Sequence, residues 1–245
     1  MTTDSIRQAA DALRGARRVV ALTGAGISAE SGVPTFRGPE GLWRTFRAEQ
    51  LATPEAFSRD PKLVWEWYDW RRERIATVRP NAGHRVLAAW EARFPVFTLV
   101  TQNVDGLHPL AGSRHLLELH GNIWQTRCTS DGTIRDNREV PLAELPPRCP
   151  SCGALVRPHI VWFGESLDRD TLQAAHAACG AADVVLVVGT SGLVYPAAGL
   201  PRVAADAGAT VIEINPDVTP LTADAAISIR GNAGAVLPLV DAALR

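Results

Sequence analysis

A glycine-rich turn follows the first apolar segment of the chain. The β-branched run at residues 19–22 has the character of a buried strand, and it leads directly into Gly24, Ala25 and Gly26. Small residues at such a turn let the backbone approach a pyrophosphate at the start of the next helix. The spacing Gly24-x-Gly26-x-x-Ala29 therefore indicates a dinucleotide-phosphate site, although a glycine-rich turn that binds no ligand shares this pattern.

The residues after this turn depart from the usual dinucleotide-binding pattern. Gly32 and Pro34 should end the helix after about two turns, and no second strand ending in Asp or Glu follows about 20 residues later to hold a ribose. The chain instead enters a loop, residues 35–38, in which Phe36 and Arg37 bring an aromatic ring and a guanidinium beside the expected phosphate site. The loop that follows Arg37, residues 38–43, contains glycine and tryptophan, and we expect it to act as a lid.

Polar side chains also follow two later strands. Gln102, Asn103 and Asp105 come after a predicted strand, where they could hydrogen-bond a polar ligand or simply cap a turn. His120 follows the next short strand and precedes Gly121. A lone histidine is more often structural than catalytic, but at a strand end beside a glycine it could project as a general base.

Tyr68 and Arg71 share one apolar face of a predicted helix over residues 61–78. Spacing alone favours an arginine that extends from the helix to solvent. The alternative is a tyrosine–arginine pair, one turn apart, that reaches into a pocket and holds a carboxylate. The neighbouring Arg72 and Arg74 are expected to lie in solvent.

Three cysteines and an aspartate have the spacing of a zinc ribbon. The pattern is Cys128-x2-Asp131-x17-Cys149-x2-Cys152, with a carboxylate in place of one thiolate. We expect a structural zinc ion that holds an insertion together and takes no part in the chemistry, with a looser site or a metal-free loop as alternatives. Cys179 is expected to be a small core residue.

The composition of the chain indicates which broad classes of protein can be set aside. The chain has 245 residues, of which 46% are hydrophobic, so it can bury a large core. A net charge of −1 predicts no general attraction to nucleic acid or to an anionic membrane. The polar N-terminus lacks the apolar core of a signal peptide, no run approaches a membrane span, and four cysteines suit a reducing compartment. We therefore expect a soluble cytoplasmic protein.

Strand and helix patterns alternate along the chain. Strands are predicted at residues 19–22, 96–101, 116–119, 184–188, 210–214 and 226–229. Helices are predicted at residues 4–15, 54–58, 61–78, 81–92, 170–180 and 196–207, with a last helix at the C-terminus. This alternation predicts an α/β fold with a doubly wound, Rossmann-like parallel sheet, whose ligands bind at the carboxyl ends of the strands. Asn215 or Asp217, after a late strand, could supply the missing ribose contact.

We expect a single catalytic domain with two insertions. The Rossmann-like core should comprise residues 1–43, 80–122 and 155–245, with a helical insertion at 44–79 and a zinc-ribbon-like insertion at 123–154. From Leu155 the chain is expected to return to the main sheet through residues 157–165, which could also offer an edge to an extended peptide.

Together, these motifs closely resemble the sirtuin family of NAD-dependent protein deacylases. The resemblance covers almost the whole chain in collinear order and is carried by residues 24–37, 101–105, 120–122 and 189–191. Tyr68-x-x-Arg71 and residues 158–165 look like the class III branch, whose members prefer succinyl- and malonyl-lysine. With this resemblance, the carboxylate-holding interpretation of Tyr68 and Arg71 becomes the favoured one.

The resemblance implies a set of site residues. Those expected to bind NAD are Gly24, Ala25, Gly26, Ser28, Glu30, Phe36, Arg37, Gln102, Asn103, Asp105, Gly189, Thr190, Ser191, Asn215, Asp217 and Ala233. Those expected to bind the acylated lysine of a protein are Tyr68, Arg71, Val161, Phe163, Gly164, Glu165, Gly192 and Val194. The catalytic residues would be His120, Asn103 and Asp105, with His120 near its ordinary pKa as general base on a ribose hydroxyl. The family's zinc site has four cysteines, and Asp131 stands where the second would be.

The implied reaction transfers the acyl group from lysine to the ribose of ADP-ribose and releases nicotinamide. Two other functions would use the same motifs. An NAD glycohydrolase or ADP-ribosyltransferase would not need the apparent peptide-docking segments, and a non-catalytic NAD-binding module would not need a general base. The motifs leave the oligomeric state open.

Overall fold

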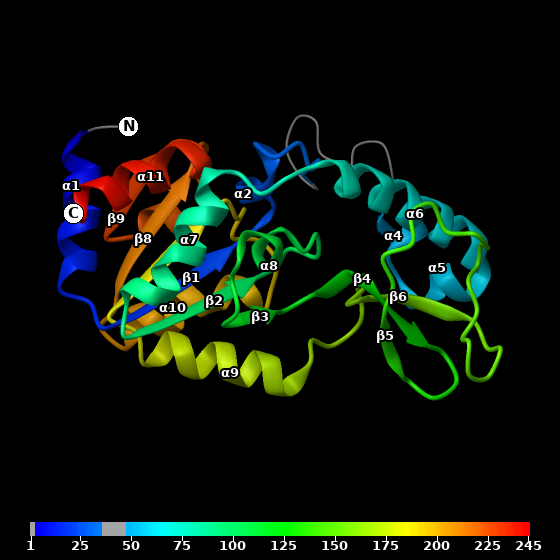
Figure 1. The fold of residues 1–245 in the computed structure, drawn as a ribbon. Helices are drawn as coiled ribbons and strands as arrows, with labels where there is room; N and C mark the ends of the chain where they lie inside the picture. The colour runs from blue at the N-terminus through cyan, green and yellow to red at the C-terminus, as the bar shows by residue number, and fades with distance from the viewer. Residues whose placement is uncertain (1–2, 36–47) are drawn as a thin grey trace.

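The computed structural model describes residues 3–35 and 48–245. Within these residues, six strands form one parallel sheet in the order β3-β2-β1-β7-β8-β9 (Figure 1). Their bounds are Arg18–Thr23 for β1, Val96–Thr101 for β2, Leu116–Glu118 for β3, Val184–Val188 for β7, Thr210–Asn215 for β8 and Ile227–Arg230 for β9. The predicted doubly wound, Rossmann-like sheet is confirmed. The proposed lid at residues 38–43 lies outside the described residues, as do Phe36 and Arg37.

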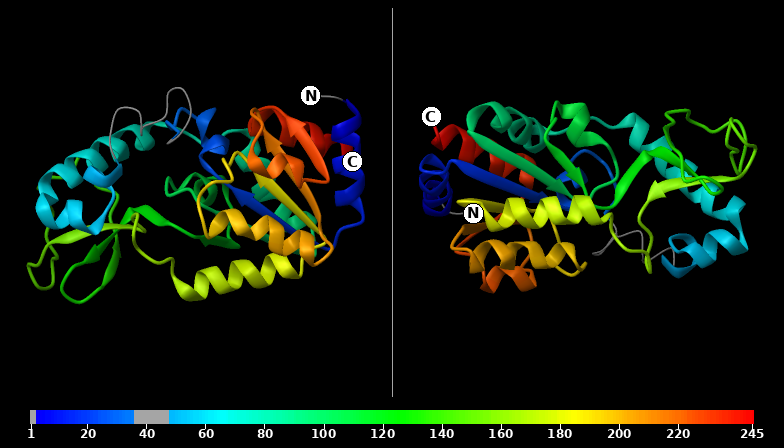
Figure 2. Two further views of the ribbon diagram at one scale, coloured as in Figure 1. Left: turned by 180° about the vertical axis from the view of Figure 1, so that it is seen from behind. Right: turned by 90° about the horizontal axis from the view of Figure 1, so that it is seen from below.

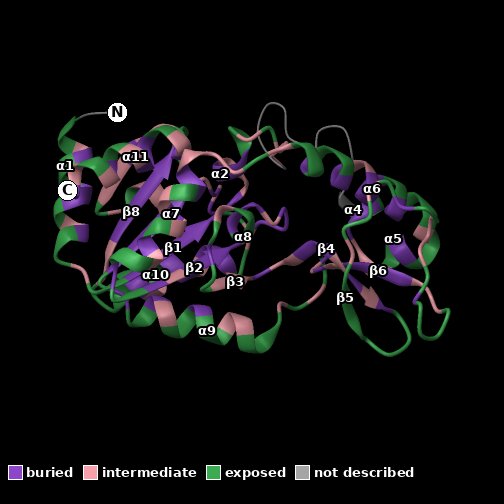
Figure 3. Ribbon diagram, viewed as in Figure 1, coloured by how far each residue is buried: buried purple, intermediate pink, exposed green. Residues whose placement is uncertain are grey.

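Successive side chains along the strands point to opposite faces of this sheet, and helices cover both faces. In β1, Val19 and Ala21 pack into one core with helices α1 (Thr3–Arg14), α7 (Ala82–Arg93) and α11 (Ala233–Ala243). Val20 and Leu22 pack into a second core with α9 (Arg169–Gly180) and α10 (Leu200–Asp206), on the opposite face (Figures 2 and 3). Because both faces are covered, the strands are apolar throughout. Cys179 is fully buried in the second core, as predicted.

A smaller lobe lies beyond the carboxyl ends of the parallel strands, on the right in Figure 1. Its antiparallel sheet has the order β5-β4-β6 and comprises β4 (Gly121–Cys128), β5 (Ile134–Asp136) and β6 (Val156–Ile160). Helices α4 (Ala48–Leu51), α5 (Pro54–Arg59) and α6 (Pro61–Thr77) pack with it around a tryptophan-rich core. The two predicted insertions thus share one hydrophobic core.

Two expectations about this lobe are wrong. The chain does not return to the main sheet at Leu155, because β6 pairs with β4 and the main sheet resumes only at β7. Apolar alternation fits either sheet, and here Val156 and Ile160 bury against the tryptophan-rich core. Arg72 is not solvated either: its side chain is fully buried and donates to the carbonyl and side-chain oxygens of Asn137 at 2.6 and 2.5 Å.

Short elements complete the part of the chain that the structure describes. They are α2 (Ala25–Ala29), α8 (Leu107–Ala111) and the 3-10 helices η1 (Ala197–Gly199) and η2 (Pro220–Ala223). Helix α2 is shorter than the two turns predicted from Gly32 and Pro34. None of the helices in the described ranges is both long and apolar enough to cross a bilayer.

Candidate active site

A cavity of about 1070 Å³ lies between the parallel sheet and the smaller lobe. Its lining includes most of the predicted NAD-binding residues, all at the carboxyl ends of parallel strands: Gly24, Ala25, Gly26, Gln102, Asn103, Gly189, Thr190, Ser191, Asn215 and Asp217. The lining also includes His120 and most of the predicted substrate-binding residues, namely Tyr68, Arg71, Val161, Phe163, Gly164, Glu165 and Val194. One cavity therefore unites segments that are far apart in the sequence.

The glycine-rich turn packs backbone against backbone on the loop after β7. Gly26 N donates to the carbonyl of Gly189 at 2.8 Å, and a Cβ added at Gly26 would lie 2.7 Å from Gly189 Cα. A Cβ at Gly24 would lie 2.8 Å from the same carbonyl oxygen. The glycines are thus required for this contact between the two turns as well as for access by a ligand.

Neighbouring strand ends are also tied together by their polar side chains. Asn215 Nδ2 donates to the carbonyl of Thr190 at 2.8 Å, and Gln102 Nε2 donates to Thr190 Oγ1 at 3.0 Å. These contacts join the ends of β2, β7 and β8 into one continuous wall of the cavity.

A buried network holds Asn103 in place. Asn103 Nδ2 donates to the carbonyl of Gly24 at 3.0 Å and lies 3.3 Å from Ser28 Oγ. Ser28 Oγ in turn donates to Asp105 Oδ2 at 2.7 Å, and Leu107 N donates to Asp105 Oδ1. Burial raises the pKa of Asp105, although both hydrogen bonds oppose this shift. Ser28 and Asp105 do not line the cavity but lie behind Asn103 and orient it.

Two buried histidines extend this network and were not singled out from the sequence. His84 Nε2 lies 3.4 Å from Ser28 Oγ, and the rings of His84 and His108 are 4.8 Å apart. His108 Nε2 lies 2.9 Å from Thr23 Oγ1. Burial lowers the pKa of His84 to about 4 and that of His108 to about 3, so both are neutral at pH 7. No local motif marks them, although Asn81 three residues before His84 is a helix-capping signal.

His120 projects from the start of the smaller lobe into the cavity. Its Nδ1 lies 2.9 Å from the carbonyl oxygen of Gln102, and a carbonyl can only accept. Nδ1 therefore carries the proton, and Nε2 has the free lone pair that a general base needs. Burial lowers the pKa of His120, opposed by the hydrogen bond to Gln102, so the expectation of an ordinary pKa is wrong.

Some of the predicted residues lie outside the cavity lining. Glu30 is exposed, and its Oε2 accepts from Gly234 N at 2.6 Å at the start of α11. Ala233 is buried next to Gly83. Gly192 packs against the side chain of Leu221. The structure therefore gives these three residues contacts within the protein and no place in the cavity lining.

Tyr68 and Arg71 line the end of the cavity formed by the smaller lobe. Both side chains are buried, so the solvent-extended arginine that spacing alone favours is not what the structure contains. The guanidinium carbon of Arg71 lies 4.9 Å from the ring centre of Trp67 and 5.5 Å from that of Tyr68. Burial lowers the pKa of Arg71, while Tyr68 and Asp105 act in the opposite direction. A buried guanidinium at a cavity wall is suited to an anionic ligand group.

An ion pair fixes the loop that follows β6. Arg157 binds Glu165 with two hydrogen bonds of 2.5 and 2.8 Å, and its guanidinium carbon lies 3.4 Å from the ring centre of Trp162. Glu165 Oε2 also accepts from Trp162 N at 2.9 Å. The loop that contributes Val161 and Phe163 to the cavity is therefore held by contacts of its Trp162 and Glu165 with each other and with Arg157 of β6.

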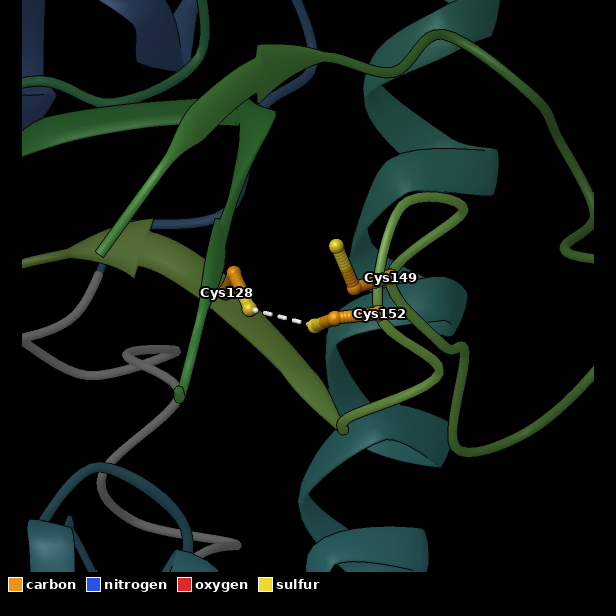
Figure 4. A group of neighbouring side chains, drawn as sticks. All are labelled: Cys128, Cys149 and Cys152. Carbon is orange, nitrogen blue, oxygen red and sulfur yellow. Dashed lines mark hydrogen bonds between the residues drawn. The ribbon is translucent and has the colours of Figure 1, made fainter. Parts of the chain in front are cut away.

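Three cysteines of the smaller lobe, one at the end of β4 and two in a later loop, lie close together (Figure 4). The sulfur atoms of Cys128, Cys149 and Cys152 all lie within 4.8 Å of one another, with 3.6 Å between Cys128 and Cys152. Three thiolates about 2.3 Å from one zinc ion fit such a spacing. Asp131 does not belong to this group among the described residues. Its Oδ1 accepts from Thr133 N at 2.9 Å, and zinc ligation by Asp131 stays a prediction.

Comparisons with known proteins agree with this site. Residues 24–196 match the model of the Sir2 family. An NAD-dependent protein deacylase from Aquifex aeolicus is 60% identical over 204 residues, covering 83% of this chain and 85% of that protein. A Sir2 homologue solved with NAD is 46% identical with a TM-score of 0.90, covering 99% of this chain and 94% of the other. A Sir2 protein solved with a myristoylated histone peptide is 33% identical with a TM-score of 0.81, covering 99% and 97%. This chain, whose motifs resemble those of sirtuins, belongs to the Sir2 family.

Proposed function

We propose that this protein is an NAD-dependent protein-lysine deacylase that removes succinyl, malonyl and acetyl groups. One observation carries the proposal: a single cavity joins a glycine-lined wall at the strand ends, the free nitrogen of His120 and a buried Tyr68–Arg71 pair. A dinucleotide, a general base and an acyl group can therefore meet in one enclosure. The relative from Aquifex aeolicus is named an NAD-dependent protein deacylase, without a stated acyl group.

The strand ends would bind NAD as a substrate. The turn at Gly24–Gly26 and the loop at residues 189–191 would accept the pyrophosphate, and Asn215 and Asp217 would bind ribose hydroxyls. Asn103, held by its buried network, would face the nicotinamide ribose. Phe36 and Arg37 remain candidates for covering the nicotinamide side.

The chemical step would proceed in two stages. First, the amide oxygen of the acylated lysine attacks the anomeric carbon of the ribose, and nicotinamide leaves with the electron pair of the glycosidic bond. His120 then removes a proton from a ribose hydroxyl, whose oxygen attacks the acyl carbon. The proton passes to the lysine nitrogen, the amide C–N bond breaks and the lysine amine leaves. The acyl carbon is then bonded to two ribose oxygens, and a water molecule adds to it, so that its bond to the anomeric oxygen breaks and the acyl group stays on the neighbouring ribose oxygen of ADP-ribose. Residues 161–165 and 192–194 would hold the peptide backbone between them.

The acyl end of the cavity favours a carboxylate. Arg71 is buried among Trp67 and Tyr68, where a guanidinium gains most from an anionic partner. A succinyl or malonyl group ends in a carboxylate, whereas an acetyl group brings only a methyl. Tyr68 and Arg71 would therefore discriminate between these acyl groups.

A double variant tests whether Tyr68 and Arg71 discriminate between these acyl groups. In the double variant Tyr68→Phe/Arg71→Met, activity on succinyl- and malonyl-lysine should fall by roughly 10- to 100-fold relative to acetyl-lysine, since charge-assisted hydrogen bonds are lost. The measurement is kcat/KM on one peptide sequence that carries each acyl group in turn. An equal loss on all three, or no loss on any, would remove the carboxylate assignment and leave a general deacylase.

An NAD glycohydrolase or ADP-ribosyltransferase is the second candidate, because it would use the same dinucleotide wall and His120. The observation that disfavours it is the buried Tyr68–Arg71 pair in the cavity lining, which such an enzyme does not need. Nicotinamide release should therefore depend on an acylated peptide. Release at the same rate without a peptide would favour the glycohydrolase, and NAD binding without any release would point to a sensor.

The three-cysteine group would hold a structural zinc ion. When bound, zinc would join the strand that ends at Cys128 to the loop that carries Cys149 and Cys152, with Asp131 as the proposed fourth ligand. None of these side chains lines the cavity at the strand ends, so zinc would act on stability and not on the chemistry.

A further inference from the structure

Trp162 donates a hydrogen bond to Tyr68 across 94 residues of sequence. The distance from Trp162 Nε1 to the Tyr68 hydroxyl oxygen is 2.9 Å, and the two residues are 3% and 1% exposed. Both also line the cavity. This bond lies directly beside the Arg71 guanidinium, which is 5.5 Å from the Tyr68 ring centre.

The direction of this bond fixes the direction of the tyrosine proton. An indole N–H only donates, so the Tyr68 oxygen accepts from Trp162 and its own proton must point elsewhere. Arg71 offers donors only and cannot receive that proton. Within residues 3–35 and 48–245, the bond from Trp162 is the hydrogen bond that the Tyr68 hydroxyl makes. The proton is thus available to an acceptor that enters the cavity.

The indole is itself firmly held. Arg157 stacks on the Trp162 ring at 3.4 Å, and Phe57 contacts it with ring centres 5.4 Å apart. The backbone N–H of Trp162 donates to Glu165, whose carboxylate binds Arg157 with two hydrogen bonds. Trp162 therefore presents its N–H to Tyr68 from a fixed position, and the hydroxyl has little freedom to turn.

We propose that Trp162 is a specificity-determining positioning residue, which holds the Tyr68 hydroxyl so that its proton donates to the terminal carboxylate of the acyl group. The proposal rests on the carboxylate recognition proposed above. Tyr68 then presents its proton as a donor toward the acyl group. A carboxylate accepts it, whereas an acyl group that ends in a methyl offers no acceptor to this buried hydroxyl, which is the arrangement that rejects a substrate most strongly.

Succinyl-lysine and butyryl-lysine provide the matched pair of substrates. Their acyl chains have the same number of carbons, and one ends in a carboxylate where the other ends in a methyl. The quantity to measure is the ratio of kcat/KM for succinyl to that for butyryl on one peptide. Four proteins are compared: wild type, Trp162→Phe, Tyr68→Phe, and the double variant. Trp90→Phe is the matched control, because the indole N–H of Trp90 donates to Asp241, and neither residue lines the cavity.

The expected results follow from the hydrogen bonds lost. Tyr68→Phe should lower the ratio roughly 10-fold or more, and Trp162→Phe should lower it about 3- to 10-fold. In the Tyr68→Phe background, Trp162→Phe should lower it no further, because there is no hydroxyl left to orient. Trp90→Phe should leave the ratio unchanged.

The outcomes distinguish failure of carboxylate recognition by Tyr68 and Arg71 from failure of the role proposed for Trp162. Arg71→Met is measured beside these proteins, and if neither it nor Tyr68→Phe lowers the ratio, carboxylate recognition fails and this inference fails with it. If Tyr68→Phe lowers the ratio but Trp162→Phe does not, or if their effects simply multiply, only the role of Trp162 is overturned. Should Trp162→Phe not fold, replacement of Trp162 by benzothienylalanine removes the N–H while keeping the bicyclic shape, and the same ratio decides.

Discussion

His120 has its two ring nitrogens in different environments. Nδ1 is committed to the Gln102 carbonyl, and Nε2 is left as the base. Burial lowers the pKa of His120 below the ordinary value of about 6.5, so the neutral, active form predominates at and above neutral pH. Burial of His120 thus keeps this base unprotonated at neutral pH.

The pH dependence of the reaction should reflect this shift. The fraction of neutral His120 rises with pH through its lowered pKa, so kcat/KM for an acylated peptide should be level at and above neutral pH and should fall only at pH values below the ordinary histidine pKa of about 6.5. A pH–rate profile at saturating NAD checks this. A rate that continues to rise between pH 7 and 8 would contradict the assignment of this limb to His120.

Removal of the base should be severe. His120→Ala should lower peptide-dependent turnover by about 100-fold or more, the usual contribution of a positioned general base. Equilibrium binding of NAD should change much less, because the dinucleotide wall is formed by other segments. The two measurements together distinguish loss of the base from loss of the fold, and turnover near the wild-type rate would exclude His120 as the base.

Helix α2 and the loop after β7 pack backbone against backbone at Gly26 and Gly189. The turn between β1 and α2 is so close to Gly189 that a side chain at Gly26 cannot be accommodated without moving backbone. A motif usually interpreted as a ligand contact is here also a packing contact between two strand ends. The dinucleotide wall therefore behaves as one unit.

The substitution Gly26→Ala tests this unit. The added Cβ would lie 2.7 Å from Gly189 Cα, so we expect a loss of about 1–3 kcal/mol in the free energy of unfolding and weaker binding of ADP-ribose. Urea denaturation and calorimetry measure the two effects. Gly15→Ala is the matched control, because a Cβ there meets no atom within 4 Å, and it should cost nothing. Equal stability of the two variants would refute the packing argument.

The molecule consists of a parallel-sheet domain and a smaller lobe that meet at the cavity. The dinucleotide wall belongs to the first, while Tyr68, Arg71 and the loop after β6 belong to the second. His120 stands at the junction, where β3 passes into β4. The stability of the smaller lobe therefore bears on the acyl end of the site more than on the dinucleotide end.

Zinc binding should be a property of this smaller lobe. We expect close to one zinc ion per chain by elemental analysis, lost in Cys149→Ser and kept in Cys179→Ala, whose thiol lies in the main core. Removal of zinc by a chelator should lower the melting temperature, because the ion joins strand β4 to a distant loop. Protein that is fully stable and free of zinc would contradict this expectation. Asp131→Ala should weaken zinc retention if Asp131 is the fourth ligand, and Asp131→Cys should strengthen it.

The sequence alone established the parallel sheet and most of the dinucleotide wall. Strand alternation, helix periodicity and the small or polar residues at strand ends are local properties, and parallel strands bring their carboxyl ends to one edge whatever the details of packing. For this reason Gly24, Asn103, Gly189 and Asn215 could be assigned together before any contact was known.

Contacts between distant segments decided the rest. Two of these contacts join residues 65 or more positions apart: the hydrogen bond from the buried Arg72 to Asn137 and the bond from Trp162 to Tyr68. The pairing of β6 with β4 depends on which of two sheets accepts an apolar strand. His84 and His108 meet only because α7 and α8 pack together. Local patterns specify which side of an element is apolar, but the partner that covers that side is chosen by the packing of the whole chain.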